Sequence, residues 1–188
     1  MIYSIVHGKY IHVQKPDFYT RRRCSCPPGD RRSSRGGALR DAEKTGFPSR
    51  SFDIITEYGA LHHLDLETAY GEMARILKPN GKAICVEALG HNPFIHLYRR
   101  LTPSLRTEWE VNHILRKRDV ALASKYFHKV DMEFFHLATL VAVPFRNSAS
   151  FDRLLSALEQ IDEAILRFPV LKWQAWQIVF TLSQPINA

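Results

Sequence analysis

The most constraining feature of this sequence is a helical pattern that lies between two short apolar runs. Residues 52–56 form the first run and residues 82–89 the second. Between them, from Leu66 to Leu77, apolar residues recur with the spacing i, i+3, i+4, i+7, i+8 and i+11, which places them on one face of a helix. A strand, a helix and a strand joined by short links predict a βαβ unit with two parallel strands.

The ends of this helix are marked by residues with clear preferences. Asp65 is expected to cap the N-terminus, because its carboxylate can accept a hydrogen bond from a free N–H of the first turn. Pro79 opposes continuation beyond Lys78, and Asn80 with Gly81 is expected to form the turn before the next strand. The first run is short and apolar enough to predict a strand that is buried on both faces.

The sequence after Gly90 continues the alternation of helices and strands. Asn92 and Pro93 are typical of a helix start, and Thr107 with Glu110 forms a capping box for a second helix that reaches Arg118. A helix capped by Asp119 is predicted to reach residue 127, and strands are predicted at 130–135, 138–143 and 176–182. A further helix is predicted from Ser150 to before Pro169. Its inward side chains would be Phe151, Leu154, Leu155, Leu158, Ile161 and Ile165.

The positive charge of the chain is concentrated in one segment. Residues 21–40 contain seven arginines and one aspartate, so they carry +6 of the net charge of +7. The stretches 24–29 and 31–37 contain almost no apolar side chains, and residues 15–37 are predicted to be disordered. Three interpretations of this segment are a basic arm for RNA or a membrane surface, an ordinary solvated loop, and sequence that is not native to the fold.

Several classes of protein are disfavoured by composition. No run of 18 or more apolar residues is present, and no signal peptide is recognisable, so we expect a cytoplasmic chain without a membrane partner. Three cysteines give no disulfide framework. Cys24 and Cys26 lack a second ligand pair for zinc, and we expect no metal site at His62-His63-Asp65 or at Glu110 and His113.

Ligands of open α/β sheets bind beyond the carboxyl ends of the strands. Residues 57–60 follow the first strand and residues 87–90 follow the second, and Gly59 and Gly90 would allow close backbone approach. Asp41-Ala42 lies one loop before the first strand. A carboxylate there can accept from the exocyclic amine of a base, while the next N–H donates to a ring nitrogen.

At this point the motifs resemble a known family. The stretches Asp41-Ala42-Glu43, Phe47-Pro48, Ser51–Ile55, Leu61-His62-His63 and Ile76–Lys82 are together similar to the central motifs of class I S-adenosylmethionine-dependent methyltransferases of the small-molecule, type-11 kind. The resemblance covers residues 40–90 and, in general layout, 91–183.

The resemblance implies a fold, a cofactor and a set of site residues. The fold would be a Rossmann-like α/β sheet with flanking helices, incomplete in its N-terminal half, over residues 41–188, with a helical acceptor-site insertion at 91–128. The cofactor would be S-adenosylmethionine. Asp41 would bind the adenine amine and Ala42 the adenine ring, and the residues expected near the rest of the cofactor are Glu57, Tyr58, Gly59, Leu61, His62 and His63.

The chain departs from the family before residue 41. The family's first strand, its acidic-x-Gly-x-Gly turn and its ribose-binding acid are not recognisable there. This difference favours the interpretation of residues 1–40 as an irregular, non-native segment. We therefore expect weak or no cofactor binding by the chain as written, and an open edge on the strand at residues 52–56.

The reaction implied by the resemblance is in-line transfer of the sulfonium methyl group to a small-molecule nucleophile. A general base is needed only if the acceptor arrives protonated. The candidate bases are His63, Glu87, His91 and His136, and the candidate substrate-binding residues are Tyr98, Arg99 and Arg100. The alternatives are a non-catalytic methyltransferase-like subunit and an RNA-associated methyltransferase that uses the arginines of residues 21–40.

Overall fold

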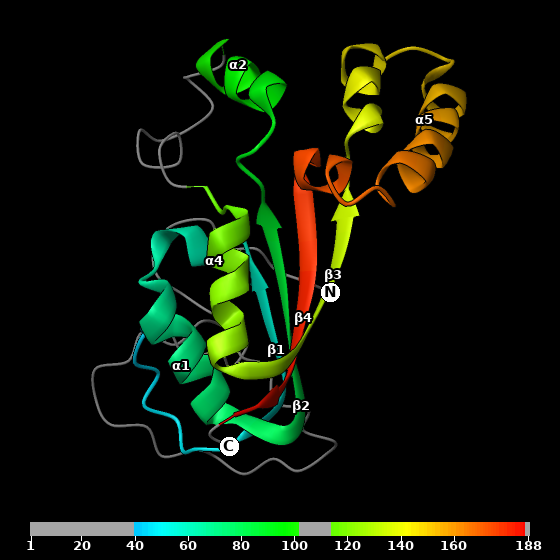
Figure 1. Ribbon diagram of the computed structural model, residues 1–188. Helices are drawn as coiled ribbons and strands as arrows, with labels where there is room; N and C mark the ends of the chain where they lie inside the picture. The colour runs from blue at the N-terminus through cyan, green and yellow to red at the C-terminus, as the bar shows by residue number, and fades with distance from the viewer. Residues whose placement is uncertain (1–39, 102–113, 187–188) are drawn as a thin grey trace, which may run out of the picture. The chain divides into compact units, whose positions relative to one another are not determined.

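The computed structural model of the protein describes residues 40–101 and 114–186, with the side chains of residues 98–101 left aside (Figure 1). Two compact units are present. Unit 1 contains the described residues up to Cys85 together with Leu122–Val130 and the residues from Thr181 onward; unit 2 contains the described parts of Val86–Ala121 and Asp131–Phe180.

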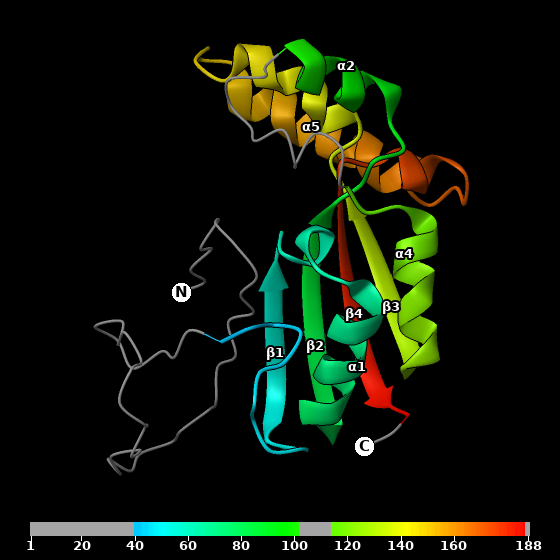
Figure 2. The ribbon, with the colours of Figure 1, turned by 90° about the vertical axis from the view of Figure 1, so that its left-hand side faces the viewer.

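A mixed four-stranded sheet is built from strands that pair in the order β1-β2-β4-β3. The strands are β1 (Phe52–Tyr58), β2 (Leu77–Ala88), β3 (Phe127–Phe135) and β4 (Gln177–Pro185). Figures 1 and 2 show β1, β2 and β3 pointing the same way and β4 pointing the opposite way. The predicted α/β class and the parallel pair of β1 and β2 are therefore confirmed.

Helix α1 (Leu66–Ile76) joins β1 to β2 and forms much of the core of unit 1. As predicted, the Asp65 side chain accepts a hydrogen bond from the Thr68 N–H and caps this helix. Its predicted apolar stripe is largely confirmed, since Ala69, Tyr70, Met73 and Ala74 are all buried.

The passage from α1 to β2 differs from the prediction. The strand begins at Leu77, which has extended backbone and no exposed surface, so Pro79, Asn80 and Gly81 belong to β2 and do not form a separate turn. A Cβ on Gly81 would lie 3.0 Å from the Asp53 carbonyl oxygen of β1. This glycine is therefore needed for close approach of two strands.

Strand β1 is only partly enclosed. Ile55 has no exposed surface, whereas the Ile54 side chain is 48% exposed, so the predicted burial on both faces is wrong. Among the described residues β1 lies at one edge of the sheet.

Unit 2 contains most of the remaining helical segments. Helix α2 (Pro93–Leu101) starts as predicted, with the Asn92 carboxamide oxygen accepting from the Phe94 N–H at 2.9 Å. Helix α4 spans Lys117–Leu122, so Asp119 lies in its first turn and accepts from the Arg116 N–H, and does not precede the helix as predicted. The other helices are η1 (Leu61–His63), η3 (Ala123–Lys125), η4 (Ala138–Phe145), α5 (Phe151–Ile165) and η5 (Leu171–Gln174).

Two further predictions in unit 2 are wrong. Residues 138–143 were predicted as a strand and belong to the 3-10 helix η4. Ile161 of α5 is 47% exposed, and Asp162 is the buried residue at this point of the helix. Both differences have one cause, because the Asp162 carboxylate accepts the N–H groups at the start of η4.

Several predictions lie outside the described residues. They are the disordered segment at 15–37, the cysteines Cys24 and Cys26, the capping box at Thr107, and the pair Glu110 and His113. Among the helices of the described ranges, none is both long and apolar enough to cross a membrane.

Candidate functional site

The acidic loop that precedes β1 is attached to the N-terminus of α1. Asp41 Oδ1 accepts from the Glu43 N–H at 3.0 Å, and the Asp41 carbonyl oxygen accepts from the Lys44 N–H at 3.2 Å, which closes a tight turn. The Glu43 carboxylate in turn accepts from the Asp65 N–H at 3.0 Å. Ala42 is 1% exposed, so the turn is anchored by its own side chain as well.

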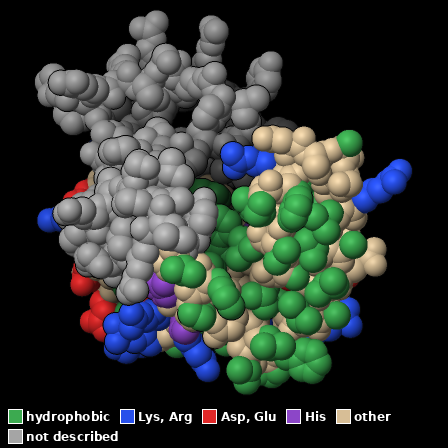
Figure 3. Space-filling view, turned by 90° about the horizontal axis from the view of Figure 1, so that it is seen from above, with side chains coloured by type: hydrophobic (Ala, Val, Ile, Leu, Met, Phe, Trp, Pro, Cys, Tyr) green, Lys and Arg blue, Asp and Glu red, His purple; other side chains and the backbone are tan. Residues whose placement is uncertain are grey.

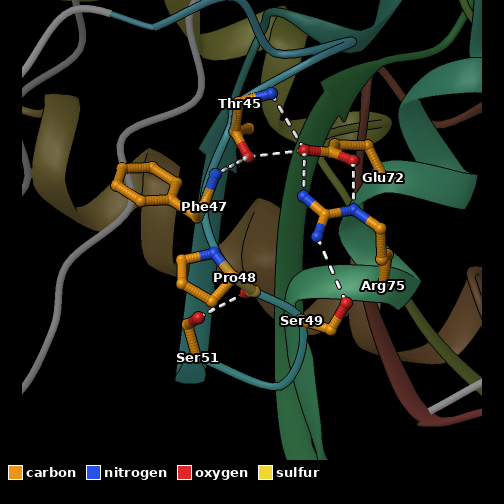
Figure 4. Close-up of polar contacts among 7 residues, drawn as sticks. All are labelled: Thr45, Phe47, Pro48, Ser49, Ser51, Glu72 and Arg75. Atoms are coloured by element: carbon orange, nitrogen blue, oxygen red, sulfur yellow. Dashed lines mark hydrogen bonds and ion pairs between the residues drawn. The ribbon is translucent and has the colours of Figure 1, made fainter.

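A network of charged hydrogen bonds holds the middle of the loop (Figure 4). Glu72 Oε1 of α1 accepts from both the N–H and the hydroxyl of Thr45, at 2.9 and 2.5 Å. Arg75 donates to both oxygens of Glu72 at 2.7 Å and to the Ser49 hydroxyl at 3.3 Å. The Arg75 guanidinium, with the Thr45 hydrogen bonds, lowers the pKa of Glu72 against the opposing effect of burial.

The end of the loop caps α1. The N–H groups of Arg50 and Ser51 donate to the carbonyl oxygens of Arg75 and Ile76 at 3.0 and 2.8 Å. These are carbonyl groups that an isolated helix end leaves without partners. The loop is therefore bonded to α1 at its start, its middle and its end.

This attachment leaves two polar groups of the Asp41-Ala42 turn without a hydrogen-bond partner in the described structure, and only the Asp41 carboxylate belongs to an exposed residue, because Ala42 is 1% exposed. Within the described residues, neither the second carboxylate oxygen of Asp41 nor the Ala42 N–H has a hydrogen-bond partner. Asp41 is exposed. One acceptor beside one donor is the complement of an adenine edge, which offers an amine beside a ring nitrogen. The Asp41 carboxylate is therefore accessible to the amine that the resemblance implies, whereas the Ala42 N–H belongs to a buried residue.

The turn after β1 is organised by Glu57. The Glu57 carboxylate is 4% exposed and accepts from the N–H groups of Ala60 and Leu61. Gly59 has φ +64°, a conformation that side chains other than glycine rarely adopt. Tyr58 is half exposed and Leu61 is fully buried. Glu57 and Leu61 thus hold the turn, and Tyr58 and Gly59 form its accessible part.

The adjacent histidines after this turn lie close together. The rings of His62 and His63 have centroids 4.1 Å apart. No group of three metal-ligating side chains is present in the described part of the chain.

The last residues of β2 and those that follow it belong to unit 2 and are packed tightly. Glu87 is 1% exposed. A Cβ on Gly90 would lie 2.2 Å from Cγ2 of Ile114, so the space beside Gly90 is filled by the protein and not left for a ligand. The Gly90 N–H donates to the Leu115 carbonyl oxygen at 3.0 Å.

His91 follows directly and is partly buried beside the start of α4. Its Nε2 accepts from the Lys117 N–H at 3.4 Å, and its Nδ1 is buried without a hydrogen-bond partner in the described residues. Burial, and next the charge of Arg116, lower the pKa of His91.

A groove of about 570 Å³ lies in unit 2, beside the carboxyl end of β3. Apolar and charged side chains share its wall. They are Met132, Glu133, Phe134, Phe135, His136, Thr139, Glu159, Asp162, Glu163, Leu166, Arg167 and Lys172.

Asp162 is the buried centre of this wall. Its carboxylate is 6% exposed and accepts from the N–H groups of Leu137, Ala138 and Thr139 at 3.1, 2.6 and 3.2 Å, and from the Thr139 hydroxyl at 2.8 Å. His136 Nδ1 lies 3.2 Å from the same hydroxyl oxygen. These contacts order the start of η4.

The hydrogen bonds fix the tautomer of His136. The one hydroxyl proton of Thr139 is donated to Asp162, because a carboxylate only accepts. Toward His136 the hydroxyl oxygen is therefore an acceptor, so Nδ1 carries the proton. In the neutral imidazole the lone pair is then on Nε2, which is the form required of a general base.

The candidate residues divide between the units. Asp41, Ala42, Glu57–Gly59, Leu61 and His62-His63 lie in unit 1, whereas Glu87, His91, Tyr98–Arg100 and His136 lie in unit 2. Sequence reasoning missed Glu72, Thr139 and Asp162. The signal for Asp162 was its place on the apolar stripe of α5, eleven residues after Phe151.

Comparisons with known proteins agree with the motifs. Residues 30–85 match the family described as methyltransferase domain. This part of the chain is similar to methyltransferase domains, in agreement with the resemblance that the motifs carry. The match includes the acidic loop, β1, α1 and most of β2, and it ends before the groove.

Two curated methyltransferases are similar over short stretches. The ubiquinone/menaquinone biosynthesis C-methyltransferase UbiE of Cupriavidus taiwanensis is 43% identical over 51 residues, which are 27% of this chain and 21% of that protein. The uncharacterized methyltransferase YcgJ of Bacillus subtilis is 36% identical over 80 residues, which are 42% of this chain and 27% of that protein. The chain thus spans about a quarter of the length of these methyltransferases.

A solved methyltransferase structure is similar at low identity. Phosphoethanolamine N-methyltransferase 2 of Haemonchus contortus, in complex with S-adenosylhomocysteine, superposes with a TM-score of 0.48 at 17% identity, over 79% of this chain and 37% of that one.

Proposed function

We propose that this chain acts in methyl transfer from S-adenosylmethionine to a small organic acceptor. The observation that carries the proposal is the family match over residues 30–85, which includes the Asp41-Ala42 turn with its exposed carboxylate. When bound, S-adenosylmethionine supplies an electrophilic methyl group on a sulfonium. The chain's own part is positioning, because the leaving thioether is neutral and stable.

In this proposal, unit 1 binds the cofactor. The Asp41 carboxylate accepts from the adenine amine and the Ala42 N–H donates to the ring, and the loop's bonds to α1 keep both groups in place. Tyr58, Gly59 and His62 border the rest of the cofactor. Glu57 and Leu61 act through the turn that they hold.

Unit 2 would bind the acceptor. A groove of about 570 Å³ has the size of a site for a small molecule, and its wall combines apolar and charged side chains. Among the four candidate bases, His136 is favoured by its fixed Nδ1–H tautomer, whereas Nε2 of His91 is occupied by the Lys117 N–H. Tyr98, Arg99 and Arg100 of α2 remain proposed acceptor-binding residues.

The first test measures binding of S-adenosylhomocysteine to the protein. Ligand-observed NMR is suitable because it detects weak binding, with dissociation constants up to about the millimolar range. We expect weak binding that is reduced about tenfold in Asp41→Ala, equivalent to about 1.4 kcal/mol. The matched control is Asp53→Ala, another exposed carboxylate of unit 1, which pairs with Lys78. Equal binding by Asp41→Ala and the unchanged protein would contradict the proposed role of the loop.

The second test addresses the base. Transfer of a labelled methyl group to a panel of phenols, thiols and amines is compared between the unchanged protein and His136→Gln. We expect His136→Gln to lower kcat at least tenfold for acceptors that arrive protonated, and to leave binding of S-adenosylhomocysteine unchanged. Equal kcat in both proteins would exclude His136 as the base.

A further inference from the structure

We propose that unit 2 carries a peripheral binding surface for anionic lipid bilayers. The surface consists of residues 93–101 of α2, residues 138–148 around η4, and residues 166–172 before and within η5, and we refer to it as the basic apolar face. Figures 1 and 2 show α2, η4 and α5 at the same end of unit 2, and they show residues 166–172 at the opposite end of α5 from residues 146–148.

The first observation is the exposure of large apolar side chains. Eight of the fourteen exposed large hydrophobic residues of the described chain lie in these three short segments. Figure 3 shows hydrophobic side chains gathered on this face. The eight residues and their exposed fractions are Phe94 77%, Leu97 54%, Val141 62%, Val143 39%, Phe145 51%, Phe168 60%, Val170 77% and Leu171 41%. Such a concentration is typical of a surface that binds a membrane or a partner.

The second observation is the sign of the charge. The same three segments contain five basic residues and no aspartate or glutamate. The basic residues are Arg99, Arg100, Arg146, Arg167 and Lys172. The neighbouring helix α5 is the opposite, with four acidic residues and one arginine, so the positive charge is confined to the segments that expose apolar side chains.

The order of residues in the segment 166–172 favours a lipid surface over an acidic protein. Phe168, Pro169, Val170 and Leu171 are consecutive and exposed, and Arg167 before them is exposed as well. Lys172 follows them, half-buried, with its ammonium group 5.2 Å from the centre of the Phe134 ring. Apolar side chains that enter the acyl boundary and basic side chains at the level of the lipid phosphates are the recurring arrangement of peripheral membrane contacts. The sequence-based expectation of no membrane partner concerned a spanning segment, and a contact of this kind requires none.

The test is co-sedimentation of the full chain with vesicles of phosphatidylcholine alone and with vesicles of phosphatidylcholine mixed with the anionic lipid phosphatidylglycerol. We expect binding to the anionic vesicles and at least tenfold weaker binding to the neutral ones. The double variant Phe168→Ser, Val170→Ser should lose at least tenfold in affinity for anionic vesicles at constant charge. Its matched control is Ile161→Ser, which removes a 47% exposed residue of acidic α5 and should bind as the unchanged protein does.

The charge arm compares the double variant Arg146→Gln, Arg167→Gln with Arg153→Gln on α5. We expect the double variant to bind several-fold more weakly at low salt and the control to bind normally. The arginines of residues 21–35 could also bind anionic lipid, so the comparison is repeated in a chain with these six arginines changed to glutamine. In that chain the Phe168→Ser, Val170→Ser variant must still bind anionic vesicles more weakly than the Ile161→Ser control. If that difference disappears, or if the serine double variant binds like the unchanged protein, the basic apolar face is not a membrane-binding surface.

Discussion

Units 1 and 2 differ in how many of their apolar side chains are buried. Among the described residues, unit 1 buries fifteen apolar residues and exposes three large ones, whereas unit 2 buries eight and exposes eleven. Unit 1 is therefore enclosed around its own core. Unit 2 keeps much of its apolar surface available for contacts outside itself.

The polar contacts of the two units differ in the same way. The loop before β1 in unit 1 is bonded to α1 through Glu43, the pair Glu72 and Arg75, and two backbone N–H groups. The groove wall in unit 2 depends on one carboxylate, that of Asp162. The proposed cofactor loop is thus held by several independent hydrogen bonds, whereas the wall of the proposed acceptor groove is held by one side chain. We therefore expect a mutation of that side chain to lower the free energy of unfolding more than a mutation of one loop contact.

The largest effect is expected from Asp162→Ala. The variant leaves three N–H groups and a hydroxyl at the start of η4 without their acceptor, and the free energy of unfolding should fall by about 3 kcal/mol. Urea denaturation measures the loss, and hydrogen exchange should accelerate at Leu137, Ala138 and Thr139. Glu159→Ala is the control, because Glu159 is exposed one turn earlier and makes no hydrogen bond in the described structure. Equal stability of the two variants would remove the contrast between the units.

A smaller loss is expected from Glu72→Ala, because the loop keeps its other attachments. Loss of the Arg75 and Thr45 hydrogen bonds should lower the free energy of unfolding by about 2 kcal/mol. The control is Glu67→Ala, which removes an exposed ion pair with Lys125 and should leave stability unchanged within error.

The contribution of Glu72 should also depend on pH. Its pKa in the folded state is lowered below the ordinary 4.5 by Arg75 and Thr45, so its stabilising effect is complete above pH 4.5 and is lost as the pH falls through the folded value. Glu72→Gln should therefore lose less stability than the unchanged protein between pH 5 and pH 3, a window taken about one unit around the ordinary value. Parallel stability curves for both proteins over this range would show that Glu72 is not the group concerned.

The difference between the two units also explains which parts of the fold could be predicted from the sequence. In residues 52–89 the apolar spacing, the Asp65 cap and the short links all indicate the same βαβ unit, and the structure has it. The run 138–143 was misread as a strand because a short apolar run does not distinguish a strand from a helix. The group that decides its conformation is Asp162, twenty-three residues beyond Thr139 in sequence.

The candidate site was predictable to a similar extent. The Asp41-Ala42 turn was identified from its place before β1 and from the resemblance, and its hydrogen bonds to α1 through Glu72 and Glu43 were not. The relation of His136 to Thr139 and Asp162 depends on a positive φ of 64° at His136, which no local pattern indicates for histidine. Contacts between distant segments set these parts of the site.

Substitution of two glycines in unit 1 tests how closely its strands and its helix are packed. Gly81→Ala should destabilise the protein by about 1–2 kcal/mol, because the new methyl group would lie 3.0 Å from the Asp53 carbonyl oxygen and 2.8 Å from Leu77 Cδ1. Gly71→Ala on α1 should stabilise by about 0.5–1 kcal/mol, because alanine is the better helix former and the nearest atom, Tyr126 Cε1, is 3.5 Å away. Thermal unfolding of the two variants should move in opposite directions. A shift of the same sign would mean that β1 and β2 are less closely packed than the structure indicates.

The smallest effect is expected at His91, in the less enclosed unit. Burial and the charges of Arg116, Lys117 and His96 lower its folded pKa below 6.5, while Asp119 opposes them. The unfolded chain therefore binds a proton more readily, so stability is complete above pH 6.5 and falls as the pH decreases through the folded pKa. His91→Gln keeps an acceptor for the Lys117 N–H and does not titrate, so its urea midpoint should decrease less between pH 7.5 and pH 5.5, about one unit on either side of the ordinary value. His128→Gln, at an exposed position of β3, should follow the unchanged protein. If the urea midpoint of His91→Gln decreases as much as that of the unchanged protein, protonation of His91 does not destabilise unit 2. The packing around Nδ1 would then adjust to the added proton, as expected of a unit that buries few of its apolar side chains.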